Sequence, residues 1–330
     1  MRIRGLRQVC LPIFLSITSL TLAARDAERA QAAFLAGNRL FDKGQFRDAA
    51  DMYTRALEQD PENAKALYNR ALASEMVDRK AAIRDWKEFL ELAQNNPAWK
   101  AMAPQIRERV ETLEKMPALP DSLLPSAYLP KGGDYYKEVA QGSEGLQFNE
   151  FPVKVFVGSV PKGWERATRT ALESWIRVFP LQEVAWREGA DIVLSWGASR
   201  KESQRAGRES DVVQVEKNDN GAVVKRTKTA FINLDSSRHW SEDEKRATVL
   251  HELGHALGIQ GHSDSAGDVM FGTIEETLTE MVAQKAMTAP PRYGAPPANA
   301  SPSLPHKPSQ RDVNTLIRLY NTPAPLARAS

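Results

Sequence analysis

The chain has 330 residues, 42% of them hydrophobic and 26% charged, and is therefore long enough for two globular domains with separate cores. Its 44 basic residues are almost balanced by 42 acidic ones, which excludes the strongly basic composition typical of a nucleic-acid-binding protein. The single cysteine, Cys10, lies near the start, so the rest of the chain must be held together by core packing and bound metal and not by disulfides.

The first 24 residues have the layout of a secretory signal peptide. A basic start with three arginines precedes a mostly apolar run from Val9 to Leu22, and small residues follow. An uncleaved membrane anchor is the alternative, but the run is shorter than the roughly 20 apolar residues of a bilayer span and is interrupted by Pro12. We therefore expect cleavage near Ala23 or Ala24, a secreted or periplasmic mature protein, and no stable membrane span after removal of the signal.

Residues 25–116 show helical spacing throughout. From Ala33 to Pro61 the small and aromatic residues fall at the positions of one tetratricopeptide repeat (TPR), a pair of antiparallel helices of about 34 residues. A second, looser copy runs from Leu67 to Phe89, and Trp99–Met116 is expected to be a closing helix. This resemblance implies an all-α domain of TPR-like repeats that contacts a protein partner.

Pro117–Asp134 is rich in proline and contains two adjacent glycines, so we expect a linker at residues 117–134. The remaining residues, 135–330, have the strand and helix periods of an α/β or α+β domain. We expect a helix at Trp164–Val178 and strands at Phe151–Gly158, Val184–Trp186, Asp191–Trp196, Val212–Val215 and Thr229–Asp235. A proline-rich loop is expected at 289–308, followed by a last helix at Ser309–Asn321.

A helix that carries possible metal ligands is expected to begin at Ser241, because Ser241 and Glu244 form a capping box. Its sequence places His251 and His255 four residues apart on one face, so both imidazoles can bind one zinc ion. Glu252 lies beside them and is a candidate general base that takes a proton from a zinc-activated water. The sequence therefore predicts a hydrolytic zinc site on this helix.

A catalytic zinc site needs a third protein ligand and one position left open for water. Gly258 can take the positive backbone angle that ends a helix, after which the chain turns back and brings His262 towards the metal. We favour His262 as the third ligand. Asp264, Glu275 and Glu276 are the alternatives.

The segment from His251 to Met270 resembles the active site of the metzincin zinc endopeptidases and is most like their matrixin branch. The family pattern is HExxHxxGxxH, commonly followed by serine and, after a short loop, by a methionine whose turn lies beneath the metal. Ser263 and Met270 match these two positions. Gly261 is one residue more than the pattern has before its third histidine.

This resemblance implies an α+β zincin domain with a mixed sheet and an active-site helix. It also implies one catalytic zinc ion on His251, His255 and His262, with Glu252 as the catalytic residue. Calcium is possible but not indicated, because the Asn218–Gly221 turn lacks the spacing of an EF-hand.

Together these features predict an exported zinc-dependent endopeptidase that hydrolyses a protein or peptide substrate, with N-terminal repeats for protein contacts. Two alternatives remain. The protein is an inactive scaffold that works through its TPR-like repeats, or it is a zinc amide hydrolase that acts on cell-wall peptide. The presence of Glu252 favours an enzyme, because a site that only binds needs no base.

Overall fold

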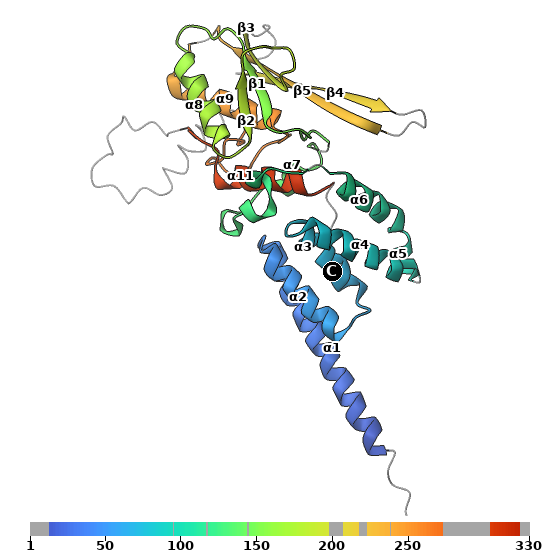
Figure 1. The fold of residues 1–330 in the computed structure, drawn as a ribbon. Coiled ribbons are helices and arrows are strands. Elements are labelled where there is room, and N and C mark those ends of the chain that lie inside the picture. The colour runs from blue at the N-terminus through green and yellow to red at the C-terminus, as the bar shows by residue number, and fades with distance from the viewer. Residues whose placement is uncertain are drawn as a thin grey trace, which may run out of the picture. The chain divides into compact units, whose positions relative to one another are not determined.

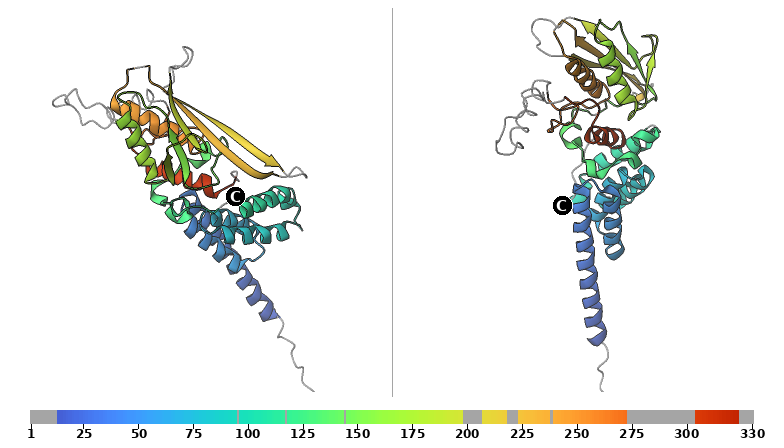
Figure 2. Two further views of the ribbon diagram at one scale, coloured as in Figure 1. Left: turned by 45° about the horizontal axis from the view of Figure 1, so that its top comes forward. Right: turned by 90° about the vertical axis from the view of Figure 1, so that its left-hand side faces the viewer.

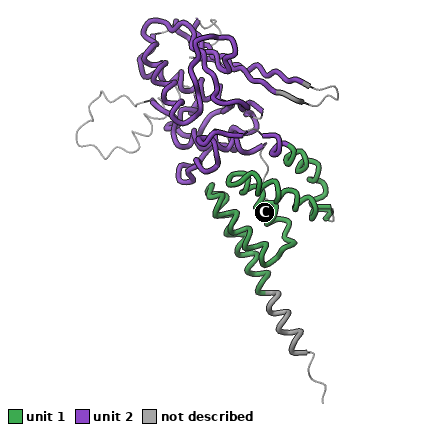
Figure 3. The backbone as a smooth tube through the Cα atoms, viewed as in Figure 1, with its two compact units in different colours: residues 1–111, 327–330 green, residues 112–326 purple. Residues whose placement is uncertain are grey.

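The structure, a computed structural model, describes the backbone of residues 13–94, 96–116, 118–143, 145–197, 207–217, 223–237, 239–272 and 304–323. Side chains are described within these ranges from residue 25 onward, except at 217 and 223–225. There are two compact units, residues 1–111 with 327–330, and residues 112–326 (Figure 3). The expected turn at Asn218–Gly221 and most of the expected loop at 289–308 lie outside the described residues.

The first unit is built from helices (Figure 1). They are α1 (Ile13–Asp42), α2 (Phe46–Gln59), α3 (Ala64–Glu75), α4 (Arg79–Gln94), α5 (Pro97–Lys100) and α6 (Ala103–Lys115). α1 packs on α2 and α3 packs on α4, which are the two expected repeats, while α5 and α6 occupy the expected closing segment. The boundary between the two units falls within α6. Among the described helices, none is long and apolar enough to cross a membrane.

The aromatic ring of Tyr53 lies between the two helices of the first repeat. Tyr53 of α2 is fully buried, and its hydroxyl donates to Asn38 Oδ1 of α1 at 2.9 Å. A Cβ atom on Gly37 would lie 2.6 Å from the Tyr53 ring, so glycine is required where α1 crosses it. Ala49 and Ala56 are also fully buried and allow the close approach of the helices.

The second unit contains a five-stranded sheet in the order β2-β1-β3-β5-β4. Its strands are β1 (Val153–Val157), β2 (Leu181–Val184), β3 (Ile192–Gly197), β4 (Gly207–Lys217) and β5 (Val223–Asp235). The neighbours of β1 and β3 are parallel to them, whereas β4 runs antiparallel to β5. The sheet is therefore mixed, as predicted.

Three strands differ in extent from the expectation. β2 begins earlier than the expected Val184–Trp186 segment, because Leu181 is buried and pairs with Val153 whereas Trp186 is 76% exposed. β4 and β5 are longer than expected because their mutual pairing continues beyond the part of β5 that also pairs with β3 (Figure 1). A strand is predicted from sequence by the alternation of apolar and polar residues. The residues in this extension can pair without such alternation.

Two helices, α8 (Glu165–Ile176) and α9 (Glu242–Ala256), lie side by side against the sheet (Figure 2). Trp175 of α8 is fully buried, and its indole N–H donates to the carbonyl of Leu250 in α9 at 3.0 Å. Leu253 of α9 is also fully buried in the same core. This packing fixes α9, the helix that carries the predicted metal ligands, relative to the sheet.

Residues 118–134, expected to be a linker, instead pack as part of the second unit. They form three short 3-10 helices, η1 (Asp121–Leu123), η2 (Pro125–Ala127) and η3 (Pro130–Gly132), followed by α7 (Tyr136–Val139). Their partner is the C-terminal helix α11 (Gln310–Asn321), where the Asn321 amide donates to the buried Leu123 carbonyl at 2.5 Å. Proline-rich composition predicts the lack of long helices here, but it does not exclude burial.

Candidate metal centre

Two candidate ligands lie on the last turns of α9, and the start and end of this helix fix their position. The capping box is present, with the Glu244 N–H donating to Ser241 Oγ at 3.2 Å and the Ser241 N–H donating to Glu244 Oε2 at 2.8 Å. The helix has ended by Gly258, which has a φ of +107° that other residues rarely adopt. His251 and His255 lie one turn apart before this end, so the predicted start and stop of the helix are both observed.

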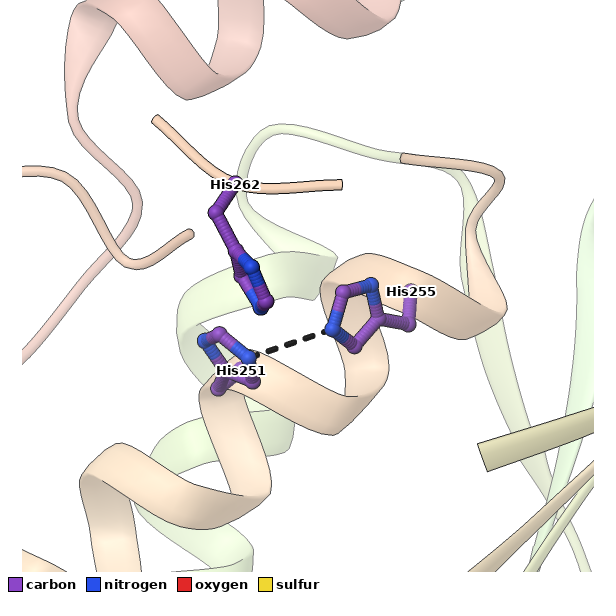
Figure 4. A group of neighbouring side chains, drawn as sticks. All are labelled: His251, His255 and His262. Atoms are coloured by element: carbon purple, nitrogen blue, oxygen red, sulfur yellow. Dashed lines mark hydrogen bonds between the residues drawn. The ribbon is translucent and has the colours of Figure 1, made fainter. Parts of the chain in front are cut away.

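His251 and His255 point their Nε2 atoms towards one another (Figure 4). His251 Nδ1 lies 2.9 Å from the Val269 carbonyl, and His255 Nδ1 lies 2.7 Å from the Ile259 carbonyl. Because a carbonyl only accepts, each Nδ1 carries the ring hydrogen and each Nε2 keeps its lone pair. The two Nε2 atoms are 3.1 Å apart, close to the roughly 3.3 Å that two tetrahedral Zn–N bonds require.

Both imidazoles favour the neutral form that binds a metal. Burial lowers the pKa of His251 to about 3, with a further contribution from the charge of His255. Burial also lowers the pKa of His255 to about 4. Metal binding at neutral pH therefore does not have to displace a proton from either ring.

His262 joins these two histidines from the loop after α9. One ligand atom from each of the three residues can be chosen so that all lie within 4.8 Å of one another. The His262 ring stacks on that of His251 with centroids 5.2 Å apart (Figure 4). Among the described residues, no other group of three histidine, cysteine, aspartate or glutamate side chains is this close. The number, type and spacing of these nitrogen donors fit zinc.

Of the alternative third ligands, Asp264 is not part of this group. The exposed Asp264 carboxylate accepts a hydrogen bond from Arg311 Nη2 at 2.8 Å, and this bond lowers the pKa of Asp264. Glu275 and Glu276 lie outside the described residues.

A second glycine turn accommodates the extra residue before His262. Gly261 has a φ of +126°, and a Cβ atom there would lie 3.2 Å from Val139 Cγ1. The preceding residue is fixed as well, because the Gln260 N–H donates to Ser143 Oγ at 2.8 Å. The inserted residue therefore fills a defined bend and does not carry His262 away from His251 and His255.

Met270, the residue at the position of the family's methionine turn, packs against α9. Its side chain is fully buried, and its sulfur occupies the space where a Cβ atom on Gly254 would be. The Met270 carbonyl accepts a hydrogen bond from the Ser263 N–H at 2.7 Å. Met270 thus joins the helix to the loop that carries His262.

Glu252 is 7% exposed and lies against the first residue of β4. A Cβ atom on Gly207 would lie 2.7 Å from Glu252 Cγ and 2.8 Å from its Oε1. No side chain fits at position 207 without moving the carboxyl group. The sequence alone gave no sign of this neighbour, because the two residues are far apart in the chain and Gly207 belongs to no motif.

A buried lysine, also not predicted from the sequence, holds the C-terminal end of α9. Lys228 Nζ donates to the Ala256 carbonyl at 2.8 Å and to the Leu146 carbonyl at 2.9 Å, and it lies 3.1 Å from Asp211 Oδ1. A cation at this end of a helix is favourable, because the last carbonyl groups lack partners within the helix. Nearby, burial raises the pKa of Glu209 to about 8, and a hydrogen bond with Asp211 contributes.

Comparison with known protein families agrees with this geometry. Residues 160–286 match the family model of the matrixins. The chain carries a matrixin domain. A TPR repeat model matches residues 37–76, N-terminal to the matrixin domain. No similar sequence was found among curated proteins. The matrixin match supports a zinc metalloprotease, and the TPR match supports a role in protein contacts.

Proposed function

We propose that the protein is an exported zinc endopeptidase in which Glu252 is the general base and His251, His255 and His262 bind the catalytic ion. The observation that carries this proposal is the meeting of the three histidines within the segment that matches the matrixins. The residue after His251 in the sequence is the buried Glu252. Export rests on the N-terminal sequence alone.

Zinc, when bound, supplies the positive charge that acidifies a water molecule and polarises the peptide carbonyl. The Glu252 carboxylate accepts the proton of the attacking water and then donates it to the leaving amine. The Val269 and Ile259 carbonyls keep the His251 and His255 rings in one tautomer and orientation throughout. The absence of a side chain at Gly207 leaves room for the Glu252 carboxyl group.

A pocket beside His251 is suited to a side chain of the peptide. Its lining is mostly apolar and comprises Ala247, His251, Asp268, Val269, Phe271, Gly272, Leu304 and Pro305. An apolar substrate residue would lose contact with water there. We infer that the substrate is a protein or peptide and that the TPR region binds a protein partner.

The test is digestion of a mixture of peptides by the purified protein with and without a zinc chelator, beside the Glu252→Gln variant. Chelator-sensitive cleavage is expected for the wild type. Glu252→Gln should keep its zinc and lose activity by a factor of about 100 to 10,000, the usual contribution of a general base. Cleavage that resists chelation, or a fully active Glu252→Gln variant, would contradict the mechanism.

A further inference from the structure

His262 differs from the other two proposed ligands because it does not lie on a helix. It is exposed and belongs to an irregular loop, whereas the rings of His251 and His255 are fixed by α9 and by backbone carbonyls. A mobile ligand weakens metal binding, because its side chain and backbone must be ordered when the ion binds. The contacts of the neighbouring residues show what holds this loop.

Ser263, the next residue, is the anchor of His262. It is 6% exposed, and its N–H donates to the Met270 carbonyl at 2.7 Å. Its hydroxyl donates to Asp268 Oδ2 and accepts from the Ser265 N–H, the latter at 3.1 Å. The backbone that carries His262 is therefore fixed at its C-terminal side through the Asp268 carboxylate.

Asp268 in turn depends on α11. Its carboxylate is 3% exposed, and its Oδ1 accepts a hydrogen bond from Ser309 Oγ at 2.6 Å. Arg311 Nη1 donates to Asp268 Oδ2, the oxygen that also accepts from Ser263, at 3.0 Å. A carboxylate this deeply buried requires a cationic partner, and Arg311 supplies it.

Arg311 contacts two residues of the loop after His262. While Nη1 contacts Asp268, Nη2 donates to Asp264 Oδ1 at 2.8 Å, two residues after His262. The guanidinium carbon lies 5.5 Å from the centre of the Tyr135 ring, which limits its movement on the other face. The planar fork of arginine suits this double role, which a lysine cannot fill in the same way.

We propose that Arg311 is a positioning residue for zinc binding: directly through Asp264, and indirectly through Asp268 and Ser263, it holds the lengthened loop so that His262 faces His251 and His255. The four residues Arg311, Asp264, Asp268 and Ser263 are called the Arg311 clamp. The proposal rests on the zinc site of the proposed function. It predicts that removal of a guanidinium group on α11 weakens zinc binding although Arg311 itself is no ligand.

The first test compares the zinc affinity of the full chain with that of Arg311→Met, by competition with a coloured zinc chelator. Arg318→Met is the matched control. Arg318 is on the same helix, donates to Asp134 Oδ1 at 2.9 Å and lies 4.1 Å from the Tyr136 ring, but these partners are outside the clamp.

We expect Arg311→Met to weaken zinc binding about 10-fold, at the lower end of the range for groups that orient metal ligands. Arg318→Met should leave the affinity unchanged. In a His262→Ala background, Arg311→Met has no ligand left to position, so its effect should disappear. Equal zinc affinity of the wild type and Arg311→Met, or an undiminished effect without His262, would overturn the proposal.

Amide hydrogen exchange of residues 259–271 in the zinc-free full chain tests the clamp without any metal. Exchange should be faster in Arg311→Met than in the wild type or in Arg318→Met, because the loop opens more often. Unchanged exchange would overturn the clamp. If the three proteins exchange as expected but the wild type binds no zinc, the clamp is supported and the proposed function is contradicted.

Discussion

The metal centre has a helical half and a loop half that are built on different principles. His251 and His255 lie on one helix, are partly buried, and receive their orientation from nearby carbonyls. His262 is exposed and is placed by contacts of its neighbours with Met270 and α11. The helical half is therefore set by local geometry, whereas the loop half depends on tertiary contacts and should be the more sensitive to distant substitutions.

The largest effect is expected where the two halves meet. Gly254→Ala would place a methyl group in the space of the Met270 sulfur, so either α9 or the Met270 turn must move. We expect a loss of about 1–3 kcal/mol in the free energy of unfolding, typical of an overpacked core, together with weaker zinc binding. Urea denaturation and chelator competition measure the two effects.

Gly267→Ala is the control for this substitution. A Cβ atom there would meet only Ser265 Oγ, at 4.0 Å, and the backbone needs no positive φ. The change in stability should stay within about 0.5 kcal/mol. An equal loss of stability in both variants would show that the loss in Gly254→Ala does not come from the contact between α9 and Met270.

A smaller effect is expected in the loop half. Gly261→Ala forces a methyl group into a φ of +126°, only 3.2 Å from Val139 Cγ1. The strain would cost about 1–3 kcal/mol if the backbone stayed in place, but we expect movement of the loop to relieve most of it at the expense of His262 placement. Zinc affinity should therefore fall while the melting temperature changes little. The opposite outcome, lower stability with unchanged zinc affinity, would show that the bend does not control the ligand.

The smallest effect is expected at the end of the helical half, because Glu209 is partly exposed and solvent screens its charge. Glu209 has a pKa raised from 4.5 to about 8, so the folded state binds more protons than the unfolded state between these values. The stability of the zinc-free wild type should therefore decrease as pH rises from about 5 to about 8. Glu209→Gln has no carboxyl group that can keep a proton at this position. The free energy of unfolding of the variant minus that of the wild type should therefore increase over that pH range.

Urea denaturation at both pH values measures this dependence, with Glu216→Gln on the exposed part of the same strand as the control. If Glu209→Gln and the wild type keep the same difference at pH 5 and pH 8, Glu209 does not retain a proton in the folded state.

The helical half could be predicted from the sequence because its causes are local. The capping box at Ser241 sets the start of the helix, the four-residue spacing puts His251 and His255 on one face, and Gly258 marks the end. The mixed sheet and the TPR region likewise followed from periodicity and family resemblance.

The loop half could be predicted only in part. The resemblance selected His262, but it could not show how a longer loop returns to the metal, because that depends on contacts with Ser143, Val139 and α11. The same limit explains the expected linker at 117–134. Its composition excluded long helices, yet the burial of Leu123 depends on a helix almost two hundred residues later.

The zinc content and peptide cleavage of the wild type beside His262→Ala show whether the helical half and the loop half form one zinc site. We expect one zinc ion per wild-type chain, and loss of both zinc and chelator-sensitive cleavage in the variant. A His262→Ala protein that keeps its zinc and its activity would show that His262 is not the third ligand.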